Sequence, residues 1–233
     1  MINLIKKELS YYLNNPIGYI TVILFAVFSN FLFVKDIFLV GSASMRPFFG
    51  LAPWLLMIFI PALSMRIIAE EKRTNTIETL LTLPISETQI VLSKFVSILL
   101  LVMITLLLTL GLPISLSLLT KIYLPEIIIS YIGLFLLSSS FIALSMYFSS
   151  LTKNQVVAFM VSAVAIFFLL VLSTDFLSTV LPKFIQDFTN YFSPVYQLQS
   201  FVKGVVDLKS IVYFLSLTVF FLFLTVIDLE KRS

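Results

Sequence analysis

The chain has 233 residues, of which 60% are hydrophobic and only 12% are charged. Soluble domains average roughly 45–50% apolar and about 25% charged residues, so this chain lacks the charged side chains that would cover a soluble fold. It contains no cysteine and no histidine, which excludes disulfides, thiolate metal sites and imidazole acid–base chemistry. The net charge of +3 is too small to indicate a nucleic-acid partner. We therefore expect an integral membrane protein embedded in a lipid bilayer.

The first residues predict a short amphipathic helix. Apolar side chains recur there at helical spacing, and the lysines fall on other faces: Ile2, Ile5, Leu9, Tyr12 and Leu13 against Lys6 and Lys7. This pattern is typical of a helix lying in the membrane interface, and Asn14-Asn15-Pro16 is expected to end it. The apolar run that follows exceeds the core of a signal peptide and carries no small-residue cleavage site, so we expect it to be retained as a span.

Six gaps between charged residues are long enough to cross a bilayer, which takes about 20 mostly apolar residues. They predict spans at about 17–34, 47–65, 95–120, 127–152, 154–174 and 210–227. The more polar stretch 175–209 is expected to form an extracytoplasmic helical segment between the fifth and sixth spans. The prediction is an all-α membrane protein with one six-span domain over residues 1–233. Pro53, Pro61 and Pro113 are expected to kink their helices.

Charge in the short loops predicts the orientation. An even number of spans places both termini on one side, and that side would hold nine of the 15 Lys and Arg residues. Because cytoplasmic loops carry the excess of positive charge, both termini are expected in the cytoplasm.

The predicted spans contain no Asp, Glu, Lys, Arg or His. Ion-coupled carriers and proton relays place such groups at membrane depth, so their absence disfavours a secondary transporter, an ion channel or an intramembrane enzyme. The fourth span instead carries a stripe of small residues, namely Ser138, Ser139, Ser140, Ala143, Ser145 and Ser149. Close helix packing is the favoured interpretation of this stripe, and a lining for a substrate path is the alternative.

The predicted cytoplasmic loop 66–94 is the most informative stretch. Asn75 followed by Glu78 matches a capping box and predicts a helix start near Thr76. Ile77, Leu80 and Leu81 would form an apolar face, and Pro84 would end the helix after about two turns. Two interpretations stay open: the helix rests on lipid, or it inserts into a groove of a soluble partner.

At these residues the chain resembles a known family. The run MRIIAEEKR at 65–73, then Thr76-Ile77-Glu78, Leu80-Leu81, Pro84 and Lys94, is similar to the signature of ABC transporter permeases of the ABC type-2 class, and within it to the gliding-motility-associated subgroup. The likeness covers nearly the whole chain. Asn75 and Ser93 stand where the family usually has Gly, and Asn is the residue that best replaces Gly in a left-handed turn.

The resemblance implies a dimer of permeases, identical or related, in the bacterial cytoplasmic (inner) membrane, with soluble ABC ATPase subunits docked below and export as the expected direction. ATP hydrolysis would belong to the partner, since no Gly here is followed by Lys and the phosphate-binding loop is therefore missing from the sequence. We expect no catalytic site, cofactor or metal in this chain. The ATPase-coupling residues would be Glu70, Glu71, Lys72, Arg73, Asn75, Thr76, Ile77, Glu78, Leu80, Leu81 and Pro84. A membrane anchor or assembly scaffold for an ATPase in a motility or envelope machine is the alternative function.

Overall fold

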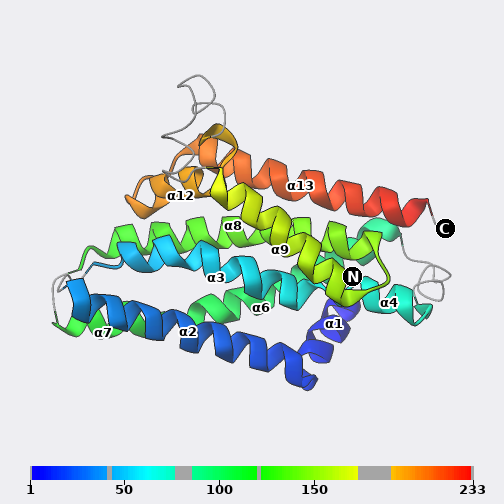
Figure 1. The fold of residues 1–233 in the computed structure, drawn as a ribbon, viewed down its shortest axis with the longest axis horizontal. Coiled ribbons are helices and arrows are strands. Elements are labelled where there is room, and N and C mark those ends of the chain that lie inside the picture. The colour runs from blue at the N-terminus through cyan, green and yellow to red at the C-terminus, as the bar shows by residue number, and fades with distance from the viewer. Residues whose placement is uncertain (1, 41–43, 77–85, 120–121, 173–189, 232–233) are drawn as a thin grey trace.

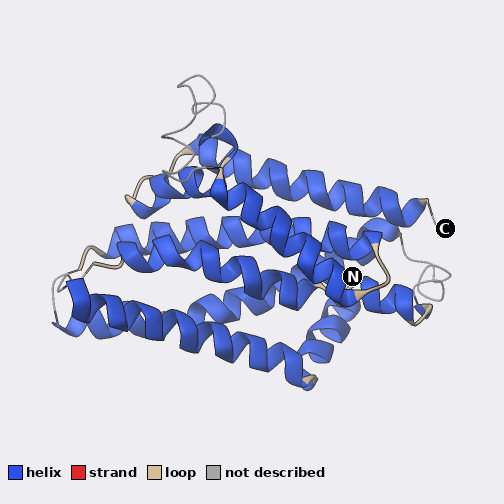
Figure 2. Ribbon diagram, viewed as in Figure 1, coloured by secondary structure: helices blue, strands red, loops and turns tan. Residues whose placement is uncertain are grey.

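The computed structural model describes residues 2–40, 44–76, 86–119, 122–172 and 190–231, and within these ranges every regular element is a helix (Figure 2). The helices are α1 (Ile2–Asn14), α2 (Pro16–Val40), α3 (Arg46–Ser64), α4 (Ala69–Arg73), α6 (Glu87–Leu108), α7 (Gly111–Leu119), α8 (Leu124–Leu151), α9 (Gln155–Val171), α12 (Pro194–Val202) and α13 (Leu208–Glu230). The expectation of an all-α chain is confirmed for the described residues.

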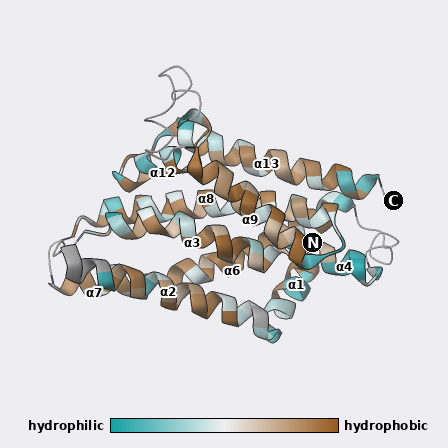
Figure 3. Ribbon diagram, in the orientation of Figure 1, coloured by the Kyte–Doolittle hydropathy of each residue, from teal (hydrophilic) through white to brown (hydrophobic). Residues whose placement is uncertain are grey.

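The long helices lie side by side and run between two ends of one bundle (Figure 1). An ion pair marks each end. Lys72 of α4 bonds Asp228 near the end of α13, at what we call the α4 end. Arg46 at the start of α3 bonds Glu126 at the start of α8 with 2.8 Å between Nε and Oε1, at the α12 end. Figure 3 shows hydrophobic residues along the middle of the helices and hydrophilic ones gathered at α4 and near the C-terminus.

Five helical stretches are long and apolar enough to cross a membrane, against the six predicted. They are Gly18–Lys35, Arg46–Arg73, Glu87–Leu118, Leu124–Leu151 and Leu208–Glu230. The predicted fifth span, 154–174, corresponds to α9, an apolar helix of 17 residues. Residues 173–189, which follow it, lie outside the described ranges.

Helix α2 continues to Val40, past the predicted span end at residue 34. The prediction stopped at Lys35 because a charge marks the edge of the hydrocarbon layer. A charged side chain does not interrupt backbone hydrogen bonds, however, so the helix can extend beyond the apolar segment. At its other end, α2 follows α1 after a single residue, and a Cβ on Gly18 would lie 2.1 Å from the Tyr12 carbonyl oxygen. Only glycine fits this turn.

The three prolines that were predicted to kink their helices differ in their effect. Pro53 and Pro61 lie inside α3, which continues through both. In the predicted third span, by contrast, the helix breaks into α6 and α7 at Thr109 and Leu110. The break falls four residues before Pro113, whose ring clashes with the carbonyl at that distance in a regular helix. The Thr109 hydroxyl compensates by bonding the Leu106 carbonyl at 2.7 Å.

Helix α8 forms the centre of the bundle and contacts α3, α6, α9, α12 and α13. The small residues of its stripe are buried. The Ser138 hydroxyl donates to the Leu134 carbonyl within the helix, and Ser139 also bonds Thr218 of α13, with 3.1 Å between the hydroxyl oxygens. This arrangement supports close packing as the role of the stripe.

Helix α12 packs against α8, with Gln197, Leu198 and Phe201 buried. The sequence predicts this stretch as part of an extracytoplasmic helical segment, because its polar residues make it unfit to span. Those residues find partners inside the fold: the Ser210 hydroxyl donates to Gln197 Oε1 at 2.9 Å, and the Ser130 hydroxyl donates to the Phe201 carbonyl at 3.1 Å.

Replacing Gly133 tests this packing. A Cβ at Gly133 would lie 2.6 Å from the Phe201 Cβ, so we expect Gly133→Ala to push α12 off α8 and to lower the free energy of unfolding by about 1–3 kcal/mol. Denaturant titration in mild detergent measures it. Gly50→Ala is the matched control, since nothing lies within 4 Å of its added Cβ. Equal stability of the two variants would contradict the packing described here.

Candidate functional site

The loop between α3 and α6 begins with a turn at 65–68 and then forms α4. After α4, Asn75 has a φ of 56°, in the left-handed region that Gly and Asn tolerate best. This conformation ends α4, whereas the residue that caps the start of a helix is normally extended. Asn75 therefore takes the left-handed role that the comparison with Gly indicated, in place of the predicted N-cap role. Thr76 is helical, and the predicted residues Ile77, Glu78, Leu80, Leu81 and Pro84 lie outside the described ranges.

Ser149 of α8 holds the start of α4. Its hydroxyl oxygen accepts hydrogen bonds from the Ala69 N–H at 3.1 Å and the Ile68 N–H at 3.4 Å, and the hydroxyl donates to the Met65 carbonyl at 3.0 Å. The first N–H groups of a helix have no partner within the helix. Ser149 supplies one, and so ties the loop to the centre of the bundle.

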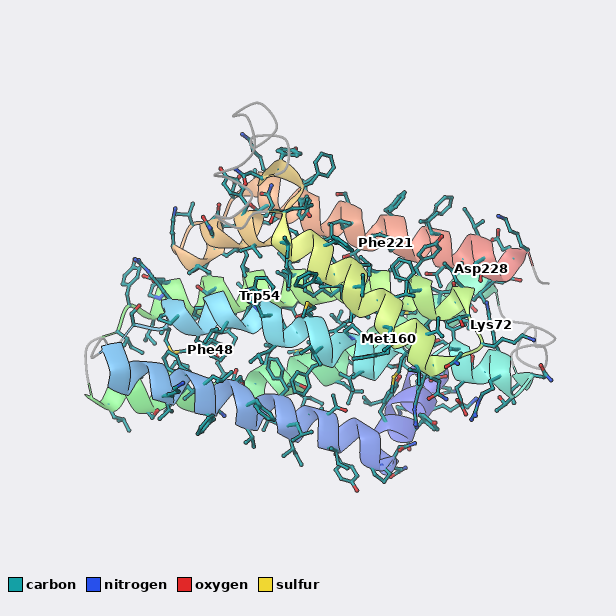
Figure 4. All side chains as sticks on the ribbon, viewed as in Figure 1. Phe48, Trp54, Lys72, Met160, Phe221 and Asp228 are labelled. Atoms are coloured by element: carbon teal, nitrogen blue, oxygen red, sulfur yellow. The ribbon has the colours of Figure 1, made fainter. Side chains whose placement is uncertain are left out.

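Lys72 connects α4 to α8 and α13. Its side chain is 2% exposed, and its ammonium group lies 2.9 Å from Asp228 Oδ2 and also donates to the Ser150 carbonyl. Figure 4 shows Lys72 and Asp228 close together at the α4 end, although they are far apart in the sequence. A buried ammonium group is tolerated only when it is paired and hydrogen-bonded, so α4 and the end of α13 must stay together.

Lys94 makes the equivalent connection on the other side of α4. Its side chain is 3% exposed, and its Nζ lies 2.6 Å from Glu71 Oε1 and 3.1 Å from Glu8 Oε1. One ammonium group thus joins α6, α4 and α1. We call Lys72, Lys94 and their carboxylate partners Glu8, Glu71 and Asp228 the buried charge cluster.

The N-terminal helix is also held near this cluster. The Tyr12 hydroxyl donates to the Leu63 carbonyl at 2.8 Å. Burial, followed by the nearby Glu8 charge, raises the pKa of Tyr12 above its usual value. Tyr12 therefore stays neutral and remains a donor at any physiological pH.

The outer side of α4 carries the remaining charges. Arg73 is 62% exposed on its side chain and bonds Glu70 of the same helix at 2.6 Å. The four charged residues predicted to flank a partner contact therefore divide into two groups. Glu71 and Lys72 bond charged residues of other helices, whereas Glu70 and Arg73 bond each other within α4. Of the last two, Arg73 is the exposed one, and a partner can reach it.

Sequence reasoning missed several members of this site. Ser149 was considered as a packing residue or as part of a substrate path, and Glu8, Ser150 and Asp228 were given no role. Their partners are between 78 and 156 positions away, apart from the closer Lys94–Glu71 pair. The one signal in the sequence is position, since Ser149, Ser150 and Asp228 lie within a few residues of predicted span ends, and all four residues are predicted on the same side of the membrane.

The described part of the cluster is suited to a mechanical role. Each ammonium group is engaged by carboxylates, and no group of acidic side chains in the described ranges has an arrangement that could hold a metal ion. Paired charges of this kind fix helices relative to one another.

Removing one lysine tests the cluster. We expect Lys72→Met to lower the free energy of unfolding by about 3 kcal/mol, because Asp228 then loses the buried ammonium group that it bonds. Arg73→Met is the matched control and should change it far less, since the Arg73 side chain is exposed and solvent screens its ion pair. Denaturant titration of both variants in the same detergent gives the comparison. Equal decreases in the free energy of unfolding would show that the buried ion pair of Lys72 stabilises the fold no more than the exposed Arg73 does.

Comparison with known proteins now adds to this geometry. A family model described as ABC-2 family transporter protein matches residues 2–231. No curated protein matches the sequence significantly. The family match includes α1, the charged loop and α13, which are the elements that the buried charge cluster joins. Because the match spans almost every residue, the chain belongs to the ABC-2 family of transporter proteins.

Proposed function

We propose that this chain is the permease subunit of an ABC transporter and couples ATP hydrolysis by a separate ATPase subunit to export of a substrate. Family membership makes the chain a multi-pass membrane component of a transport system, with an ABC ATPase as its implied partner. The observation that carries the coupling role is the attachment of the α3–α6 loop to four helices through two buried lysines.

Such an attachment suits a loop that transmits force. A partner pressing on residues 76–83 would act on α4, which cannot move without Asp228 of α13 and without Lys94 of α6. Packed helices and paired charges have discrete arrangements, so a push at the loop favours a rigid-body shift of whole helices over local deformation. The exposed Arg73, with Glu70 bonded to it, would then meet the ATPase beside the helix predicted to start near Thr76, which we call the coupling helix.

The proposed six-span topology is supported by the path of α9. This helix begins next to the α4 end and runs toward α12, so that it bridges the two ends of the bundle as the five longer helices do (Figure 1). Its 17 residues match the short limit of a spanning helix. With α9 as a span, both termini fall on one side, and loop charge favours the cytoplasm for that side.

A second permease subunit, identical or related, is proposed on the family resemblance, as are the bacterial inner membrane and the direction of transport. The alternative, a membrane anchor for an ATPase, shares the docking step and lacks the cargo. A rise in ATP hydrolysis on addition of a candidate substrate would separate the two functions in favour of transport.

Copurification tests the docking step. A tagged chain extracted in mild detergent should retain a P-loop ATPase. Leu80→Asp should reduce the amount of retained ATPase at least about tenfold. The reason is that a charge on the apolar face of the predicted coupling helix cannot enter a hydrophobic groove. Thr79→Asp is the matched control, since that position lies on the opposite face of the predicted helix. Equal retention in both variants would exclude this helix as the contact.

Cysteine labelling tests the span count. The chain has no cysteine, so single substitutions report cleanly. If α9 spans the membrane, a membrane-impermeant thiol reagent should label Lys209→Cys in intact cells. It should label Lys7→Cys, Lys153→Cys and Lys231→Cys only after the cells are permeabilised. Opposite accessibility of Lys7→Cys and Lys231→Cys would show an odd number of spans.

A further inference from the structure

A cavity of about 610 Å³ lies at the α4 end, where the α3–α4 loop meets the connection between α8 and α9. Its lining includes three basic residues, Arg66, Arg73 and Lys153, and none of the residues that line it is acidic. This cavity is separate from the buried charge cluster, whose lysines and carboxylates do not line it.

Arg66 has one side-chain nitrogen without a hydrogen-bond partner. Its Nε is buried, and no described residue accepts a hydrogen bond from it. A buried donor without an acceptor is costly, more so when it carries charge. Arg73 already shares its charge with Glu70, and Lys153 is exposed. Arg66 also lines a neighbouring cavity that Glu8, Glu70 and Glu71 border. No carboxylate lines the cavity described here, so an anion in it would meet positive charge from three basic side chains.

The start of α9 adds to the same potential. Asn154 caps this helix, with its Oδ1 accepting from the Val156 N–H at 2.9 Å, and the next residues of α9 complete the lining of the cavity. The partial positive charge at a helix N-terminus favours an anion nearby. It supplements the three basic side chains and does not define the site alone.

An apolar surface begins at the rim of the cavity. Val156, which lines the cavity, is 61% exposed, and Val157, Met160 and Val164 continue the exposed apolar face along α9. Figure 4 shows Met160 on this helix, on the way from the α4 end toward the middle of the bundle. A ligand that fits both the basic cavity and the apolar face of α9 has an anionic head and a hydrocarbon tail. Inorganic phosphate would occupy only the basic cavity.

We propose that this cavity binds the phosphate of an anionic phospholipid, with the acyl chains lying along the exposed face of α9. Basic pockets beside membrane helices bind anionic head groups in this way, and anionic lipids are abundant on the cytoplasmic side. The site is independent of ATPase docking and requires only that the α4 end lies at a membrane surface. The lipid would hold the start of α9 next to the charged loop.

The test is lipid-dependent stability of the purified chain. In mild detergent, added phosphatidylglycerol should raise the thermal unfolding temperature and leave a bound lipid in native mass spectra, whereas phosphatidylcholine and inorganic phosphate should do neither at equal concentration. The double variant Arg66→Gln/Lys153→Gln should bind phosphatidylglycerol about 30-fold more weakly, which is the expected loss for two basic contacts. Lys203→Gln/Lys209→Gln is the matched control at the α12 end, and it should bind as the wild type does.

Lys153→Gln alone keeps the experiment decisive if the double variant does not fold, because Lys153 is exposed and its loss leaves the interior intact. It should weaken phosphatidylglycerol binding about fivefold. Equal stabilisation by phosphatidylglycerol and phosphatidylcholine would overturn the anionic site, and so would equal weakening in the control variant. Full stabilisation by inorganic phosphate would overturn the lipid assignment. Failure of ATPase copurification would leave this result unchanged, so the two proposals are tested separately.

Discussion

Two buried lysines organise the α4 end of this protein. An ammonium group removed from water costs several kcal/mol unless carboxylates and hydrogen bonds replace its hydration. Lys72 and Lys94 meet this requirement with Asp228, Glu71 and Glu8. Because these partners come from α13, α4 and α1, satisfying two side chains fixes four separate segments. The short helix α4, too small to be stable alone, is held in place by the same contacts.

The middle of the bundle is held together differently. Lipid chains are as apolar as leucine, so the hydrophobic effect does not drive spanning helices together, and close packing must do so. Helix α8 achieves it with small side chains whose hydroxyls bond carbonyls of their own helix, as Ser138 does, or a neighbouring hydroxyl, as Ser139 does with Thr218. Gly133 performs the same role beside Phe201. Charge therefore fixes the end of the bundle, and steric fit fixes its interior.

The two proposals meet at one loop. Its inner side is bound to α8 and to the buried charge cluster, and Arg66 and Arg73 line the proposed lipid site. The segment that follows Asn75 is the one predicted to meet the ATPase. A loop with these three contacts would link the partner, the bundle and the membrane surface. A change at any one of these three contacts would then alter the other two, because the helices between them move as rigid units.

The sequence by itself determined the class and the outline of this protein. Hydrophobic composition and the spacing of charges predicted a helical membrane protein and located its long helices, because the bilayer demands apolar segments of a set length. The same rule located span boundaries and not helix ends, so α2 runs on to Val40, because charge marks the membrane boundary and does not end a helix. It could not supply partners for the polar residues of α12, one of which, Gln197, is hydrogen-bonded to Ser210 inside the fold.

The tertiary structure alone decided which charges face inward. Glu70, Glu71, Lys72 and Arg73 are adjacent in the sequence and equally polar, and local pattern gives no reason to separate them. Their roles differ because Asp228 and Lys94 stand on one side of α4 and solvent on the other. The partner of Lys72 is 156 residues away in the chain, and pairings at that separation depend on how whole helices pack, a property that no local stretch of sequence contains.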